Sequence, residues 1–93
     1  MIHSFANIET EKIFHFQRSR KLPPDIQRTA QRKLIQLNSI KELQELRQPP
    51  GNRFEQLMGH TPLRYSMRVN DQWRITFCWS NGGADNVQIE DYH

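Results

Sequence analysis

Cysteine is nearly absent from this sequence, and Cys78 is the only one among 93 residues. A single thiol cannot close an internal disulfide, which fits a reducing compartment and excludes a disulfide-stabilised scaffold. With one cysteine, and histidines that lack metal-ligand spacing, we expect no metal site and no other cofactor. No run of about 18 apolar residues is present, so we expect no membrane-spanning helix. Residues 1–12 lack the basic start and apolar run of a secretory signal, so these absences together favour a cytoplasmic protein.

Glycine is also scarce, and the sequence has no glycine-rich phosphate loop, nucleophile elbow or carboxylate pair of the glycosidase type. It does have a moderate excess of positive charge, because 13 Lys and Arg against 10 Asp and Glu give a net charge of +3. Arginine outnumbers lysine, and its planar guanidinium suits two-point contacts with phosphate oxygens. A net charge of this size favours a polyanionic partner only modestly. The length predicts one domain, residues 1–93, with one small core.

The first half of the chain has the apolar spacing of helices. A short helix is expected after Asn7, its N-cap, with the apolar residues Ile8, Ile13, Phe14 and Phe16. A longer helix is expected after Pro23-Pro24, with Asp25 as its cap or first-turn acid. Its apolar residues recur at spacings of three and four: Ile26, Ala30, Leu34 and Leu37. A shorter helical stripe precedes the break at 49–52: Ile40, Leu43 and Leu46.

The second half alternates apolar and polar residues as strands do. The expected strands are 63–69, 73–79 and 87–90, with further candidates at 53–58 and at Ile2 to Phe5. Helices followed by a run of strands predict an α+β fold. We expect the N-terminal helices to pack on one face of a curved, mainly antiparallel sheet.

The register of the hairpin around residues 70–72 follows from parity. Pairing Val69 with Trp73 leaves a three-residue loop, a common hairpin length. One face then carries apolar pairs, Met67 with Ile75 and Tyr65 with Phe77. The other face sets Arg68 opposite Arg74, and like charges directly opposed repel each other. A purely structural sheet has no reason to accept that repulsion, whereas a sheet that binds an anion does.

The last strand is expected to bring the chain end to this arginine pair. A turn at residues 81–85 with Val87 paired near Trp79 would put Tyr92 near Arg74. The groups expected beside the two arginines are Asp91, Tyr92, His93 and the terminal carboxylate.

This combination of groups suits RNA cleavage by the 2′-hydroxyl. A base removes the hydroxyl proton, the oxygen attacks the adjacent phosphorus, and an acid protonates the departing 5′-oxygen. Arginines can stabilise the extra negative charge of the transition state. His93 can exchange a proton near neutral pH, Asp91 can orient or polarise a neighbour, and Tyr92 can donate a hydrogen bond or stack on a base.

Each of these residues also has an ordinary explanation. The terminal histidine, Tyr92 and the two arginines could be solvated or edge-packing residues. Trp73 and Trp79 share a face with the apolar residues and are expected in the core, and Cys78 is expected to be an inert thiol on the polar face. His60 is a reserve candidate for a catalytic or RNA-binding role. A basic stretch could be a soluble loop or contact ribosomal RNA: Arg18, Arg20 and Lys21.

Four blocks of the sequence resemble the HigB-type toxins of the RelE/ParE superfamily, known as plasmid maintenance killer proteins. They are the opening Ile2 to Phe5, the middle Leu46 to Arg53, the strand pair Ser66 to Phe77 and the ending Asp91-Tyr92-His93. The resemblance runs essentially end to end, and the middle and end blocks are its most specific parts.

The resemblance implies a metal-independent endoribonuclease that cuts mRNA in the ribosomal A site during translation. It implies a HigA-like helix-turn-helix antitoxin that neutralises the toxin and represses the operon, so operator DNA is contacted indirectly. The catalytic residues carried across are Arg68, Arg74, Asp91, Tyr92 and His93. The general base stays open, because the region before the first arginine strand offers several RNA-binding or catalytic candidates: Arg53, His60 and Arg64.

Two other classes of function remain at this point. Relatives on the same scaffold poison DNA gyrase without cutting RNA, although such proteins need no terminal acid–base cluster. A non-toxic basic RNA-binding module is the other alternative, and it would cause no growth arrest on overexpression.

Overall fold

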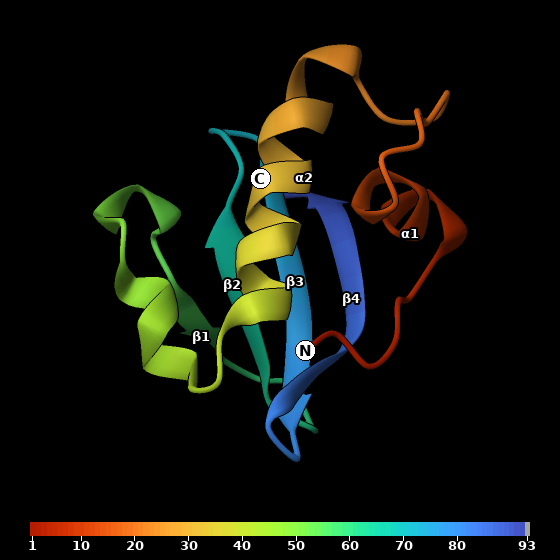
Figure 1. Ribbon diagram of the computed structural model, residues 1–93. Helices are drawn as coiled ribbons and strands as arrows, with labels where there is room; N and C mark the ends of the chain where they lie inside the picture. Colours follow the sequence, from red (N-terminus) through yellow and green to blue (C-terminus); the bar gives the residue numbers. More distant parts are fainter. Residues whose placement is uncertain (93) are drawn as a thin grey trace.

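The computed structural model describes residues 1–92 and contains two α-helices and one antiparallel sheet of four strands (Figure 1). The helices are α1 (Ile8–Phe14) and α2 (Pro24–Ser39), followed by short 3-10 helices at Leu43–Arg47 and Pro50–Asn52. The strands are β1 (Glu55–Leu57), β2 (Arg64–Arg68), β3 (Trp73–Ser80) and β4 (Gly83–Asp91), and they lie side by side in that order. The expected α+β class is confirmed.

Both helices begin where local chemistry predicts. The side chain of Asn7 accepts a hydrogen bond from the Thr10 backbone nitrogen at 2.9 Å, which caps α1. Helix α2 starts at Pro24, where a missing N–H costs nothing, and Asp25 is a first-turn acid rather than the cap. Its predicted apolar stripe is buried in full: Ile26, Ala30, Leu34 and Leu37.

The helical stripe expected from Ile40 to Leu46 is only partly realised. Ile40 has an extended backbone that ends α2, and the 3-10 helix Leu43–Arg47 follows. Glu42 and Glu45 form a reciprocal capping box at its start. Leu46 is fully buried, so the stripe contributes to the core without forming an α-helix.

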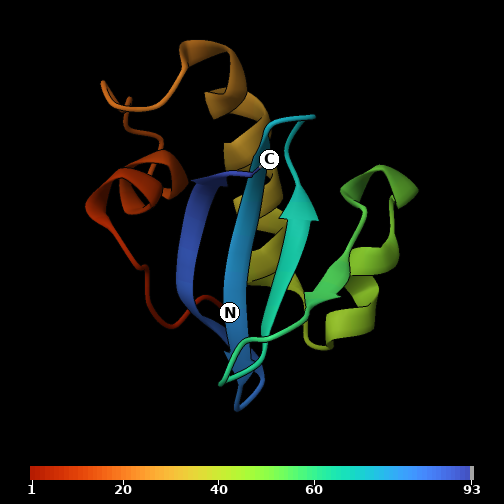
Figure 2. The same cartoon turned by 180° about the vertical axis from the view of Figure 1, so that it is seen from behind.

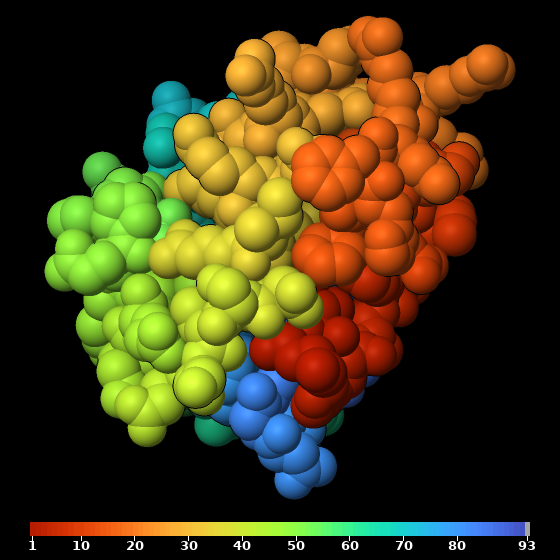
Figure 3. All heavy atoms as spheres, in the orientation of Figure 1, coloured from red at the N-terminus to blue at the C-terminus, as the bar shows by residue number. Residues whose placement is uncertain are grey.

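The helices cover one face of the sheet and leave the other face open. The core lies between α2 and the inward side chains of the strands, which include Met67, Ile75, Phe77, Val87 and Ile89. In the space-filling view the helices and their connection hide most of the sheet (Figure 3). From behind, no helix crosses the strands, which bend along their length (Figure 2). Trp73 and Trp79 pack against the core, as expected.

The hairpin between β2 and β3 has the predicted register. Met67 pairs with Ile75 and Arg68 with Arg74. The side-chain oxygen of Asn70 accepts hydrogen bonds from the backbone nitrogens of Gln72 at 2.8 Å and Trp73 at 2.7 Å, which closes the loop. Alternation along both strands therefore presents the two arginines to the open face.

The predicted turn between β3 and β4 is wrong in length. The loop is only Asn81-Gly82, both with positive φ, and Trp79 pairs with Ala84 instead of lying near Val87. An irregularity between Thr76 and Cys78 then shifts the register. Beyond it Arg74 pairs with Glu90. The end of β4 therefore lies beside the arginine pair, as expected, but in a different register.

The N-terminal segment does not form a strand. Ile2 and Phe5 make isolated parallel bridges to Ala84 and Val87, because Asn7 starts α1 almost at once. Within residues 1–92, no helix is long and apolar enough to cross a membrane.

Candidate functional site

The candidate site lies on the open face of the sheet, where β2 ends and β3 begins. Arg68 and Arg74 face each other across these strands, and β4 ends next to them at Asp91. The register alone would place two positive charges in direct opposition. The side chains relieve this repulsion by turning to different partners.

Arg74 is the more buried of the two arginines, with a side chain that is 12% exposed. One terminal nitrogen donates a 2.7 Å hydrogen bond to the Arg53 carbonyl and lies 3.9 Å from a carboxylate oxygen of Glu55. Its Nε is buried and has no hydrogen-bond partner among the described residues. Burial lowers the pKa of Arg74, whereas Glu55 and Tyr92 act in the opposite direction. An arginine remains charged at neutral pH, so the positive charge of Arg74 lies in a partly desolvated site.

Tyr92 lies over Arg74, as the sequence predicted. Its ring centroid is 5.7 Å from the Arg74 guanidinium carbon, within range of a cation–π contact. Its backbone nitrogen donates a 2.6 Å hydrogen bond to the Gln72 carbonyl, which fixes the chain end to the hairpin. Tyr92 is 40% exposed and therefore accessible to another planar group.

Asp91 ends β4 beside the β2–β3 hairpin, on the face of the sheet opposite to that of the two arginines. It pairs with Trp73, so alternation places it on the helix-covered face, and its carboxylate accepts a 3.1 Å hydrogen bond from Gln72. His93, the last predicted catalytic residue, lies outside the described residues.

Arg68 occupies the outer rim of the site. It pairs with the carboxylate of Asp71, whose side chain is fully exposed. Exposed ion pairs of this kind contribute about 0–1 kcal/mol, so a phosphate can replace the carboxylate at little cost.

Two comparisons with known proteins bear on this arrangement. The family model of the HigB toxin, described as a RelE-like toxin of type II toxin–antitoxin systems, matches residues 3–93. The chain belongs to the HigB-like toxins. It is 40% identical over 76 residues to Toxin HigB-1 of Vibrio cholerae serotype O1, covering 82% of this chain and 80% of the relative. It is also 29% identical over 72 residues to an uncharacterized protein of Haemophilus influenzae, covering 77% and 71% of the two chains.

Among the other predicted residues of this toxin, Arg53 binds Arg74 through its backbone carbonyl, whereas the rest lie apart from the arginine pair. Arg64 begins β2, about 13 Å along the strand from Arg68. His60 precedes β2 on the same side. Arg64 is bound to its own sheet, since it donates to Cys78 Sγ at 3.4 Å, Thr76 Oγ1 at 3.0 Å and the Asn86 carbonyl at 3.2 Å.

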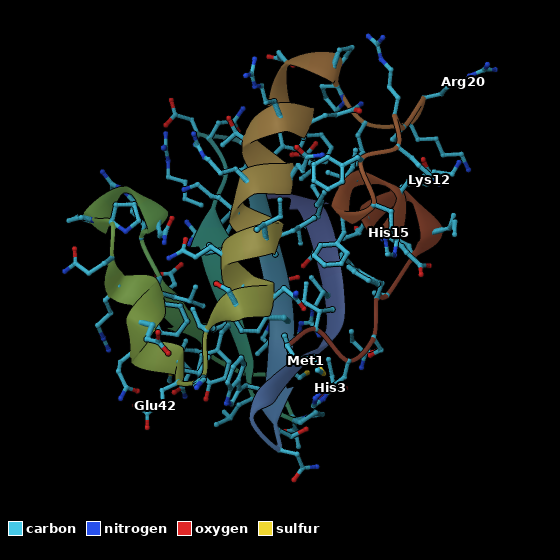
Figure 4. All side chains as sticks on the ribbon, in the orientation of Figure 1. Met1, His3, Lys12, His15, Arg20 and Glu42 are labelled. Carbon is cyan, nitrogen blue, oxygen red and sulfur yellow. The ribbon has the colours of Figure 1, made fainter. Side chains whose placement is uncertain are left out.

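The predicted basic stretch lies on the connection between α1 and α2, away from the open face. Its three cations are exposed, and Arg20 extends into solvent (Figure 4). Figure 1 draws this connection at the same end of the molecule as the β2–β3 hairpin, with α2 between them. The stretch could therefore reach a large partner at the same time as the arginine pair does. The cations are Arg18, Arg20 and Lys21.

Glu55 and Glu90 are carboxylates near the site that sequence reasoning missed. Glu55 faces Arg74 because β1 pairs with β2, in the register that sets Glu55 opposite Ser66. The sequence offered residues 53–58 only as a candidate strand, so no register could be assigned there. Glu90 was within an expected strand, but its position opposite Arg74 depends on the short turn and on one extra residue in β4, between Asp85 and Gln88.

Proposed function

We propose that this toxin is a ribosome-dependent endoribonuclease that cuts mRNA without a metal ion. Toxins of the HigB family are RNases, which gives the reaction class. The observation that carries the proposal is the largely buried Arg74 beside Arg68, with the ring of Tyr92 over it, on an open sheet face. A guanidinium in a partly desolvated site acts on phosphate charge more strongly than one in water.

In the proposed reaction a base takes the proton of the 2′-hydroxyl, and the O2′–P bond forms as the P–O5′ bond breaks. The 5′-oxygen leaves with a proton from an acid, giving a 2′,3′-cyclic phosphate and a 5′-hydroxyl. Arg74 and Arg68 stabilise the negative charge that accumulates on the phosphoryl oxygens. Tyr92 stacks on a base or donates to the phosphate, and His93 exchanges the proton. Asp91, bound to Gln72 on the other face, orients the chain end.

The ribosome supplies what this small site lacks. It holds the mRNA in the geometry of attack, and such orientation can provide several kcal/mol of the barrier. The residues proposed to contact RNA or the ribosome are Arg53, His60, Arg64, Arg18, Arg20 and Lys21. A type II toxin implies an antitoxin partner. We propose a HigA-like helix-turn-helix protein that carries the complex to operator DNA, with all of these events in the cytoplasm.

The test is cleavage of a defined mRNA by purified toxin, with and without translating ribosomes. We expect cleavage on ribosomes and little on free RNA. Arg74→Met should lower the rate by about a hundredfold, the scale of losing one preorganised charge donor. Arg28→Met, which removes an exposed arginine from the helix side, should not. Full cleavage by both Arg74→Met and His93→Ala would contradict the proposal.

A gyrase supercoiling assay and a growth assay separate the alternatives. Inhibition of supercoiling at low stoichiometry with intact mRNA would favour a binding toxin. Normal growth on overexpression would favour a non-toxic RNA-binding module.

A further inference from the structure

The strand register favours an ion pair between Arg74 and Glu90 on the open face, but the structure does not form it. Arg74 and Glu90 are direct neighbours on β3 and β4 and project from the same face. Opposite charges at such a position normally attract each other at close range. Yet, within residues 1–92, the carboxylate that lies within 4 Å of the Arg74 guanidinium is that of Glu55, on β1.

Glu90 is instead held by Thr76, its diagonal neighbour on β3. The Thr76 hydroxyl donates a hydrogen bond to Glu90 Oε2, and Thr76 itself is fully buried. A hydroxyl has one proton, so the direction of that proton decides which group it can bind.

Arg64 fixes the direction of this proton. Its terminal nitrogen donates to Thr76 Oγ1 at 3.0 Å, so the hydroxyl must act as acceptor on that side and as donor on the side of Glu90. Arg64 is held in turn by the Asn86 carbonyl and the Cys78 sulfur. The hydrogen bonds that join Arg64, Thr76 and Glu90 run across three strands and hold the Glu90 carboxylate at Thr76.

We propose that Thr76, oriented by Arg64, is a positioning residue that keeps Glu90 from neutralising Arg74. This inference rests on the proposed function, because it leaves the Arg74 charge available to an RNA phosphate. A carboxylate paired directly with Arg74 would compete with that phosphate for the same nitrogens. Glu55 competes less, since it is half exposed and 3.9 Å away.

The decisive experiment compares Thr76→Val, Thr76→Ser, Glu90→Gln and the double variant Thr76→Val/Glu90→Gln in the ribosome cleavage assay. Valine keeps the size of threonine and removes the hydroxyl, which releases Glu90 toward Arg74. We expect cleavage to fall about tenfold or more, the scale of a charged hydrogen bond gained by the wrong partner. Serine keeps the hydroxyl and should keep the activity. Glu90→Gln alone should cleave at a rate close to that of the unmodified toxin.

The double variant separates positioning from simple structural support. With glutamine at position 90 there is no negative charge to release, so we expect most of the lost activity to return. If the double variant is as inactive as Thr76→Val, or worse, the proposal is overturned. Thermal unfolding of all four variants shows whether a loss of activity reflects a loss of folded protein.

A second measurement does not depend on catalysis. The NMR signal of the Arg74 Nε–H, assigned by its disappearance in Arg74→Lys, reports the partner of the guanidinium. We expect it to shift in Thr76→Val and to return in the double variant, and an unchanged signal in Thr76→Val would refute the positioning role. If the unmodified toxin leaves mRNA intact, the proposed function fails, while this signal still decides the contact. If Thr76→Val does not fold, Thr76→Ala gives the same comparison.

Discussion

Replacing Asn52 by alanine tests how the 3-10 region supports the site. Asn52 is 1% exposed and joins two parts of the fold. Its amide nitrogen donates to Gln36 Oε1 and the Leu46 carbonyl at 3.1 Å and to the Gln48 carbonyl at 3.2 Å. Its oxygen accepts a 2.8 Å hydrogen bond from Lys33 Nζ. The side chain therefore connects α2 to the segment that leads into β1.

The loss of stability follows from counting the hydrogen bonds that alanine removes. An amide has two protons for these three acceptors, so about two neutral hydrogen bonds and one charged bond are lost, at roughly 1 kcal/mol and 1.5–3 kcal/mol. Water can reach the Lys33 end more easily than the carbonyl of Leu46, which is in a fully buried residue. Because water replaces part of the bond to Lys33, we expect the free energy of unfolding to fall by less than the full sum of these bonds, about 2–4 kcal/mol. A domain of this size should remain folded in buffer at that cost.

Urea unfolding followed by tryptophan fluorescence and circular dichroism measures this change. Gln44→Ala, at an exposed position, is the matched control and should shift stability by less than about 0.5 kcal/mol. Asn52→Asp keeps the acceptor for Lys33 but loses the donors, so it should also destabilise the protein. A loss below about 0.5 kcal/mol in Asn52→Ala would refute the reasoning. Cleavage should fall as well, because Arg53 supplies the carbonyl that Arg74 binds.

Three further changes test the fold. Asn7→Ala removes the cap that accepts from Thr10 and should lower stability by about 1 kcal/mol in the same urea titration; no loss would contradict the capping role. Ile75→Ala empties a fully buried position in β3 and should cost about 2–5 kcal/mol, with an unchanged urea dependence. Gly83→Ala would place a Cβ 2.3 Å from His3 Nε2 and 2.7 Å from the Met1 carbonyl oxygen, so the N-terminal segment must shift and the thermal midpoint should fall; an unchanged midpoint would contradict this packing.

The sequence predicted the parts of the fold that depend on periodicity. The buried stripe of α2 repeats every three or four residues, and the β2–β3 register follows from keeping apolar pairs on one face. The β3–β4 turn was mispredicted because Asn81-Gly82 was read as part of a longer loop, although this pair is a strong signal for a tight hairpin. The register shift beyond Thr76 comes from one extra residue in β4, where Asn86 has a positive φ, and a lone asparagine within a strand pattern is a weaker signal than Asn-Gly.

The backbone register of the site was predicted, and its side-chain contacts were predicted only in part. Parity placed Arg68 opposite Arg74, and the proximity of Tyr92 to Arg74 is confirmed. Asp91 was expected beside the arginines, and its pairing with Trp73 puts it on the opposite face of the sheet, the same face that the expected register would have given it. The roles of Glu55 and Thr76 depend on β1 pairing and on side-chain rotamers, neither of which a residue pattern specifies.

The opposed arginines do not by themselves demand an anion. The repulsion expected from their register is relieved within the protein, because Arg68 turns to Asp71 and Arg74 to the carbonyl of Arg53. What favours phosphate binding is the weakness of those partners. Asp71 is fully exposed, the Arg53 oxygen is neutral, and Glu55 is 3.9 Å away. An arriving phosphate would exchange these weak contacts for two-point, charge-assisted hydrogen bonds. The favourable free energy of phosphate binding therefore comes from partners that are easily displaced, and not from arginines that lack partners.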